Sequence, residues 1–407
     1  MFIWLFILFF IYAISCQQVY YSKTKSIDTM TLKAMYHHFS EDNIFLRTNH
    51  SSLMHSFTIQ SQWGITYPLS GITQEKVFAL RAQSKHPFLL RFKEGDLQMQ
   101  PKLGLLPNVT DRQTLLALAE MSYNAYTELG NDGDWYELDT NYKVNSTFGW
   151  ETDGLRGHVF GNEDDSHLII SFKGTSVGLF SKMLPSTGKD KINDNMLFSC
   201  CCAEVNKRWA PVCNCSNEPY QCDSQCLDKA LVDTELYYDY AAKIYMDVAN
   251  RFPDATIWLT GHSLGGAIAA LLGETFGVPA VGFQSPGDQL AARRLHLPRA
   301  PGAADMPIWH FGHTADPIFI GVCTGPWSGC YYGGYAMESR CHTGKVCVWD
   351  TVKDHGWRVN IASHRIGTII ESILKKPEEF PLPECVIEEE DCEDCGLWTF
   401  TDGRDLL

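Results

Sequence analysis

The sequence has little positive charge. Lys and Arg together number 33 against 48 Asp and Glu, and the formal net charge is −15. No stretch of the chain combines a basic stripe with interleaved aromatic side chains. Because a chain of this charge repels a phosphate backbone, nucleic acid is excluded as an expected partner.

A hydrophobic run long enough to cross a bilayer comfortably is also lacking. The chain opens MFIWLFILFFIYAISC, with fourteen apolar residues before Ser15, whereas a membrane span needs about 20. No Lys or Arg precedes the run. Its length favours a cleaved signal peptide, with Ala13 and Ser15 at the cleavage site, over a short membrane anchor. In either case residues 1–16 direct the chain into the secretory pathway.

The 407 residues contain no internal repeat and suffice for one or two domains. Residues 17–104 form a strand-rich N-terminal region without a chemical motif. From a helix predicted to start at Thr110, residues 105–376 alternate strands with helices, which indicates an α/β fold with a mostly parallel sheet and flanking helices. Residues 177–232 interrupt this pattern as a cysteine-rich insertion, and residues 377–407 form an acidic tail that also contains cysteines.

Fifteen cysteines are present, and fourteen remain when Cys16, beside the apolar segment, is set aside. In a secretory chain we expect disulfides; the alternative is a zinc site, since Cys392 and Cys395 have CxxC spacing. The first and third of three clusters hold odd numbers of cysteines, so full oxidation requires at least one bridge between clusters. The clusters are Cys200, Cys201, Cys202, Cys213, Cys215, Cys222 and Cys226; Cys323, Cys330, Cys341 and Cys347; and Cys385, Cys392 and Cys395.

Four Asn-X-Ser/Thr tripeptides are predicted glycosylation sites, which suits a lumenal protein. They begin at Asn49, Asn108, Asn145 and Asn214.

The stretch TGHSLGGAIAALLG, residues 260–273, joins a predicted strand to a predicted helix. So sharp a turn tolerates only small side chains two residues on either side of its centre, and Gly261 and Gly265 provide them. Ser263 is then exposed at the top of the sheet beside a helix N-terminus, which favours developing negative charge. We therefore predict that Ser263 is a nucleophile and that His262 supports the turn.

A serine nucleophile needs a base, and the base needs an orienting carboxylate. The order Ser, acid, His is expected for an α/β-hydrolase. Asp316 follows the strand in IWHFGHTADPIF and is the predicted acid. His364, directly before the last helix, is the predicted base. The rivals are Asp288, Asp305, Asp350 and Asp354 for the acid, and His342 and especially His355 for the base.

The tetrahedral intermediate of ester hydrolysis needs an oxyanion hole. The backbone N–H of Leu264, directly after the nucleophile, is one predicted donor. Thr175, behind Gly174 at the end of HLIISFKGTS, is the other, although a strand-end turn with no such role gives the same pattern.

Residues 177–226 are predicted to form a substrate-facing cap. Apolar side chains recur there at near-helical spacing, and they form either a lid over Ser263 or part of the core. They are Leu179, Phe180, Met183 and Leu184.

At these residues the sequence resembles the class 3 lipases, which are α/β-hydrolases, over about residues 105–375. The cysteine-rich insertion, HTADPIF, the segment KVCVWDTVKDHGWRVNIASHRIG and the CEDC tail also resemble the fungal autophagy-related vacuolar lipases. The resemblance implies Ser263, Asp316 and His364 as the triad, and no cofactor or metal.

It further implies a type II membrane glycoprotein that travels through the endoplasmic reticulum and multivesicular bodies to the vacuole. There it hydrolyses the phospholipids and acylglycerols of autophagic bodies and intralumenal vesicles, associating with membranes through its N-terminal segment and cap. Two alternatives stay open: a secreted esterase for soluble esters, and a catalytically inactive lipid-binding protein.

Overall fold

The computed structural model describes twelve parts of the chain, in which the elements below lie. They are residues 26–40, 43–47, 57–69, 99–127, 147–148, 154–175, 187–203, 211–234, 236–295, 297, 306–388 and 392–401.

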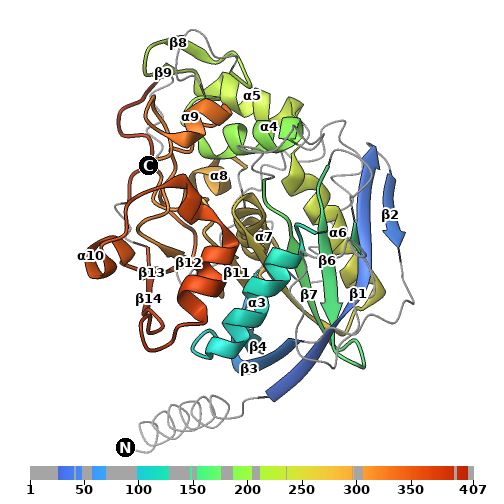
Figure 1. Cartoon of the computed structure of the whole chain (residues 1–407). Helices are drawn as coiled ribbons and strands as arrows, with labels where there is room; N and C mark the ends of the chain where they lie inside the picture. The colour runs from blue at the N-terminus through green and yellow to red at the C-terminus, as the bar shows by residue number, and fades with distance from the viewer. Residues whose placement is uncertain are drawn as a thin grey trace, which may run out of the picture.

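Five parallel strands form the centre of the main sheet, in the order β13-β12-β11-β10-β7 (Figure 1). Their sequences are rich in β-branched and aromatic residues and are buried almost throughout, as expected for parallel strands covered on both faces. They are β7 (His167–Phe172), β10 (Thr256–His262), β11 (Ala280–Phe283), β12 (Ile308–His313) and β13 (Lys345–Trp349).

Antiparallel strands extend this sheet on both sides. On one side β14 pairs with β13; on the other the order continues β6-β1-β3-β4, with β5 beside β6 and β2 beside β1. Strands of the N-terminal region and of residues 105–376 thus share one sheet. The bounds are β1 (Ser26–Ser40), β2 (Asn43–Arg47), β3 (Phe57–Thr66), β4 (Lys102–Pro107), β5 (Thr147–Phe148), β6 (Gly157–Gly161) and β14 (Cys385–Ile387).

Helices cover both faces of the sheet, because successive side chains of each strand point to opposite sides. Ile257 and Leu259 of β10 pack in the core on the side of α6 (Tyr237–Arg251) and α7 (Leu264–Phe276). Trp258 between them packs on the other side, with α3 (Arg112–Asn124) and the π-helix η3 (Thr368–Leu374). The sheet, its two helical layers and the α7 turn form an α/β-hydrolase fold, as predicted.

The first helix of residues 105–376 begins later than predicted. The structure starts α3 at Arg112, and its N-cap is Asp111, whose carboxylate accepts a hydrogen bond from the Thr114 backbone N–H at 2.9 Å. Thr110 instead bonds Asn108 through its hydroxyl. An aspartate cap one residue further on therefore takes the place of the predicted Thr110 cap.

The cysteine-rich insertion contains α4 (Thr187–Phe198), α5 (Ser224–Asp233) and a small sheet. The strands β8 (Ser216–Glu218) and β9 (Gln221–Cys222) pair there with β15 (Thr399–Phe400), so the tail lies against the insertion.

Seven disulfides join the fourteen cysteines from Cys200 onward, which confirms the expected oxidation and the bridge between the first and third clusters. The pairs are Cys200–Cys395, Cys201–Cys222, Cys202–Cys213, Cys215–Cys226, Cys323–Cys330, Cys341–Cys392 and Cys347–Cys385.

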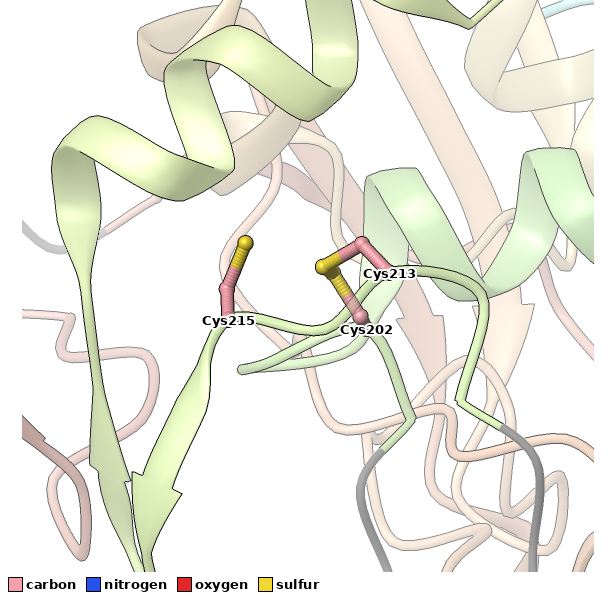
Figure 2. Close-up of side chains that lie close together, drawn as sticks. All are labelled: Cys202, Cys213 and Cys215. Atoms are coloured by element: carbon pink, nitrogen blue, oxygen red, sulfur yellow. A yellow bond between two sulfur atoms is a disulfide. The ribbon is translucent and has the colours of Figure 1, made fainter.

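A zinc site at the CxxC pair is therefore wrong, since both of its cysteines are bonded to distant partners. The sulfur atoms of Cys202, Cys213 and Cys215 also lie close together (Figure 2). Cys202 and Cys213 are bonded to each other and Cys215 to Cys226, so these thiols are not free to bind a metal.

Within the described ranges, every helix is too short or too polar to cross a bilayer. The apolar residues 1–16 lie outside the described residues.

Candidate active site

Ser263 stands at the turn between β10 and α7 in a backbone conformation that few residues adopt, with φ 58° and ψ −132°. The two glycines of the motif make this turn sterically feasible. A Cβ on Gly261 would collide with the backbone of Gly265, and a Cβ on Gly265 would collide with the backbone of Phe172 in β7. A strained residue with a positive φ at a turn from strand to helix is the arrangement of a nucleophile elbow.

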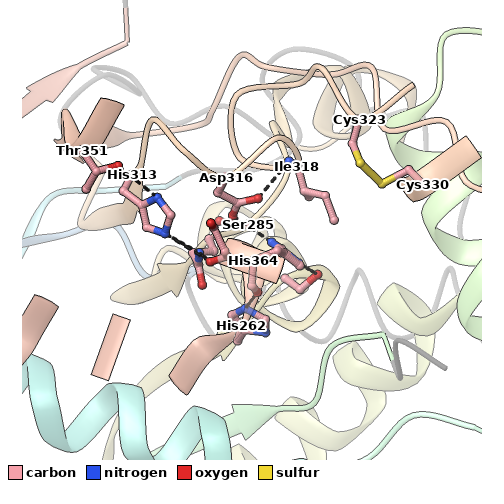
Figure 3. Close-up of polar contacts among 12 residues, drawn as sticks. His262, Ser285, His313, Asp316, Ile318, Cys323, Cys330, Thr351 and His364 are labelled. Atoms are coloured by element: carbon pink, nitrogen blue, oxygen red, sulfur yellow. Dashed lines mark hydrogen bonds and ion pairs between the residues drawn. A yellow bond between two sulfur atoms is a disulfide. The ribbon is translucent and has the colours of Figure 1, made fainter. Parts of the chain in front are cut away.

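His364 joins Asp316 and Ser263 in one continuous hydrogen-bonded line. Figure 3 shows His364 and Asp316. Nε2 of His364 lies 2.8 Å from Oγ of Ser263, and its Nδ1 lies 2.8 Å from Oδ2 of Asp316. Asp316 follows β12, and His364 ends the 3₁₀ turn η2 (Ile361–His364) before η3. The three predicted residues, distant in sequence, are thus brought together.

The environment keeps Asp316 ionised. Burial alone would raise the pKa of this fully buried carboxyl, but the attraction and hydrogen bond of His364 outweigh burial and hold the pKa below its ordinary value. The Ile318 backbone N–H donates a further hydrogen bond to Oδ1 at 2.9 Å. A carboxylate acceptor at Nδ1 leaves Nε2 of His364 as the nitrogen available to the serine proton.

Leu264 and Thr175, the predicted oxyanion donors, both lie next to residues of the turn: Leu264 follows Ser263, and Thr175 follows Gly174, which packs against the serine. Leu264 is the first residue of α7, and the first N–H groups of a helix have no partner within it. Gly174 lies so close to Ser263 that an added Cβ would be 3.0 Å from the serine Cβ and would collide with the His262 carbonyl oxygen. This contact places Thr175 beside the serine.

Asp194 is a site residue that the sequence did not reveal. The Thr175 hydroxyl donates a hydrogen bond to its Oδ2, and its Oδ1 is buried with no hydrogen-bond partner. Burial raises the pKa of Asp194 to about 8, although the bond from Thr175 opposes the rise. Asp194 lies in α4, in a stretch without a recognisable motif, so only its spacing from Asp190, one helical turn earlier, hints at a shared buried face.

His262 supports the turn, in the way predicted from its place in the motif. Its Nε2 donates to the carbonyl oxygen of His364 at 2.8 Å, because a carbonyl can only accept. Its Nδ1 then accepts from the Tyr126 hydroxyl at 2.7 Å. Burial, and then repulsion by His364, lower the pKa of His262 to about 3, so the ring stays neutral. Tyr126, at the end of the α3 region, was not predicted.

The rival residues lie elsewhere or in other roles. His355 is exposed and its ring packs against Phe380, with centroids 4.2 Å apart. His342 donates from Nε2 to the Ser285 carbonyl oxygen.

Among the acids, Asp288 binds the backbone and hydroxyl of Thr343, Asp350 caps α10 (Thr351–His355), and Asp354 is exposed on that helix. Asp305 lies outside the described residues.

Two of the four predicted glycosylation sites lie within the described residues. Asn214 is exposed. Asn108 is fully buried and donates from its side-chain nitrogen to Gln60 at 3.2 Å, so a glycan on it is incompatible with this fold. Asn49 and Asn145 lie outside the described residues, as do the apolar lid residues Leu179, Phe180, Met183 and Leu184.

Comparison with known proteins places this site in a family. Residues 199–279 match the family model "Lipase (class 3)". A Kluyveromyces lactis protein is 48% identical over 74% of this chain and 58% of its own length. An Eremothecium gossypii protein is 44% identical over 82% of this chain and 65% of its own length, and a Saccharomyces cerevisiae protein is 50% identical over 74% and 58%. All three are named "Putative lipase ATG15".

Two solved structures are similar at low identity. Lipase II from Rhizopus niveus is 16% identical, with a TM-score of 0.30 over 58% of this chain and 80% of its own. Lip2 lipase from Yarrowia lipolytica is 14% identical, with a TM-score of 0.29 over 57% and 77%. The chain spans about three-fifths of the length of the curated relatives it matches. By sequence identity this chain is similar to the fungal ATG15 proteins over most of its length, and its residues 199–279 match the class 3 lipases.

Proposed function

We propose that this protein is a serine lipase that hydrolyses acyl esters of membrane phospholipids and acylglycerols. One observation carries the proposal: Ser263, His364 and Asp316 form an unbroken hydrogen-bonded line at a strained strand–helix turn. Such a line activates a hydroxyl that is otherwise a weak nucleophile. The names of the relatives support an ester of a lipid as the substrate.

In the first half of the reaction, Oγ of Ser263 attacks the ester carbonyl carbon while Nε2 of His364 takes the hydroxyl proton. The carbonyl oxygen becomes an oxyanion that the N–H groups of Leu264 and Thr175 stabilise. Asp316 stabilises the imidazolium. When the tetrahedral intermediate collapses, the C–O bond to the alcohol breaks, His364 returns the proton to the leaving oxygen, and the acyl group stays on Ser263.

In the second half, His364 takes a proton from water, and the resulting hydroxide attacks the acyl carbon. Collapse releases the fatty acid and returns the proton to Oγ of Ser263. The same base therefore serves both halves, and the atoms and charges balance without a cofactor.

We place this reaction in the vacuole lumen, where it breaks down autophagic bodies and intralumenal vesicles. Residues 1–16 deliver the chain there as a type II anchor or a cleaved signal peptide. Seven disulfides support an oxidising route. Cells that lack the protein should retain undigested vesicles in the vacuole, and restoring it with Ser263→Ala should not clear them; clearance by that variant would contradict the proposal.

The direct test is hydrolysis of phospholipid vesicles by the purified protein and by Ser263→Ala. Loss of the nucleophile is expected to lower turnover on the order of 10⁴- to 10⁶-fold, with circular dichroism unchanged. A folded Ser263→Ala protein with substantial activity would refute the assignment.

His364→Ala and His355→Ala form a matched pair for the base. His364→Ala should be as inactive as Ser263→Ala, since it removes the imidazole whose Nε2 lies 2.8 Å from Oγ of Ser263. His355→Ala should keep wild-type turnover, because its ring packs on Phe380 instead. The reverse result would show that His355 is the base.

A further inference from the structure

A charge-free stretch of chain lies directly after Asp316. No charged residue occurs between Asp316 and Glu338, in a protein of net charge −15. Within it the loop of residues 321–334 exposes large apolar side chains: Trp327 is 97% exposed, Tyr332 76% and Val322 52%. A fully exposed Trp beside an exposed Tyr is unusual unless these side chains meet a partner.

The 321–334 loop is held rigid. The Cys323–Cys330 disulfide closes it, the Ser328 backbone N–H donates to the Gly325 carbonyl at 3.0 Å, and the Ser328 hydroxyl accepts from the Cys330 N–H at 3.1 Å as the cap of α9 (Gly329–Gly333). Trp327 is therefore presented in one place without prior ordering, which lowers the entropic cost of docking it.

The loop also contacts the turn that carries His364, and the chain at its end contacts the helix that carries Asp194. Gly329 packs so tightly on Ile361 that an added Cβ would be 2.8 Å from its Cγ2, and Ile361 begins the turn that ends at His364. The side chain of Asn195 in α4 donates to the Gly334 carbonyl at 2.8 Å and accepts from the Ala336 N–H at 3.1 Å. Figure 3 shows the Cys323–Cys330 bridge in the same view as Asp316 and His364.

The charges around the loop indicate which partner it fits. Helix α4, which the loop contacts through Asn195, exposes Lys189 and half-exposes Lys191, whose Nζ lies against Gly334. The apolar Ile192 beside Lys191 is 38% exposed. Exposed aromatic side chains on a loop whose neighbouring helix carries lysines match the boundary between acyl chains and anionic headgroups of a lipid bilayer.

We propose that the 321–334 loop docks this protein onto a lipid bilayer, with Trp327 and Tyr332 inserted among the headgroups, and so holds the mouth of the Ser263 site against its substrate. The inference rests on the proposed function, since it names the surface by which that site reaches a membrane lipid. It requires no movement of the catalytic residues.

The test uses the full chain and vesicles of phosphatidylcholine and phosphatidylserine. Trp327→Ser with Tyr332→Ser should lower vesicle binding by sedimentation about tenfold or more, because the apolar area available for burial is removed. Hydrolysis of vesicle lipid should fall with it, while kcat/KM on a short soluble ester stays at the wild-type value. Val386→Ser, which removes a side chain 55% exposed on the edge strand β14, is the control and should change neither.

Unchanged vesicle binding in the double variant would overturn the docking proposal, and so would equal losses on the vesicle and soluble substrates, which would give the loop a role inside the site. The proposed function fails separately: in that case the wild type hydrolyses neither substrate, or Ser263→Ala hydrolyses both. Binding measured with Ser263→Ala separates docking from turnover.

Discussion

Asp194 is a carboxyl group buried beside the place where the reaction develops negative charge. An ionised Asp194 would repel the oxyanion near Thr175, whereas a neutral one can stay hydrogen-bonded to the Thr175 hydroxyl without opposing it. Because burial raises its pKa to about 8, the group is protonated at pH values below that.

We therefore expect kcat on a soluble ester to decline as the pH rises through about 8. Asp194→Asn keeps the shape and cannot ionise, so its activity should persist on the alkaline side. The pH profiles of the two proteins, measured at saturating ester, decide the point. If the activity of both proteins declines alike at alkaline pH, a group other than Asp194 causes the decline.

His262 is a positioning residue, because it acts on the reaction through His364. Its Nε2–H fixes the carbonyl oxygen of His364, and through it the imidazole that faces Ser263. His262→Phe should lower kcat about 10- to 100-fold with little change in KM, since a misplaced base slows proton transfer without weakening substrate binding. Tyr126→Phe, which leaves that bond intact, should have a smaller effect. A purely structural role would predict loss of folded protein instead.

At this scale the sequence predicted what local chemistry dictates. The glycines around Ser263 follow from the turn itself, and Asp316 and His364 from the order of elements that a serine nucleophile requires. Asp194 and Tyr126 could not be predicted, because α4 and α3 bring them to the site through packing between segments far apart in the chain. The buried state of Asn108 is likewise a result of packing, which a tripeptide motif does not encode.

Among the elements, the contact of α3 with η3 contains a buried acid. Glu120 of α3 is 3% exposed, and its Oε1 lies 4.0 Å from Nζ of Lys375, which follows η3. Burial raises the pKa of Glu120 to about 7, although Lys375 opposes the rise. The folded protein therefore binds a proton here more tightly than the unfolded chain does.

The free energy of unfolding should consequently fall as the pH rises from about 4.5 to about 7, with the contribution of Glu120 intact at lower pH and lost above. This single shift corresponds to about 3 kcal/mol. In denaturant titrations, Glu120→Gln should remove that part of the pH dependence, whereas Glu379→Gln, at a half-exposed ion pair with Lys376, should not. If the free energy of unfolding depends on pH in the same way for Glu120→Gln and the wild type, the Glu120 carboxyl stays ionised in the folded protein.

Element boundaries were less predictable than element types. The strand β10 and the helix α7 lie on either side of Ser263, as predicted. The last predicted helix is the π-helix η3, and His364 before it ends the 3₁₀ turn η2, with extended backbone at Arg365 between the two. That break lets His364 face Ser263, which no helical periodicity reveals.

For the whole molecule, the sequence predicted the parallel centre but not the full sheet. Strands β1, β3 and β4 join it through β6, and pairing between segments so far apart depends on backbone hydrogen bonds that no local pattern specifies. The disulfide count indicated a bridge between clusters, but not that Cys200 would be joined to Cys395 across 195 residues.

That bridge determines what a protease can do to this protein. Among the disulfides of the described residues, Cys200–Cys395 alone connects the chain up to Cys226 to the chain from Cys323 onward, so it spans every peptide bond between them. A single nick between Ser263 and Cys323 places Ser263 and His364 on different pieces of chain, yet leaves one covalent molecule. Nicked protein should therefore run as one band without reductant and as two with it, while Cys200→Ala with Cys395→Ala should give two bands in both. We propose that the enzyme works in a compartment with other hydrolases. There this disulfide would keep the two pieces of a nicked chain together.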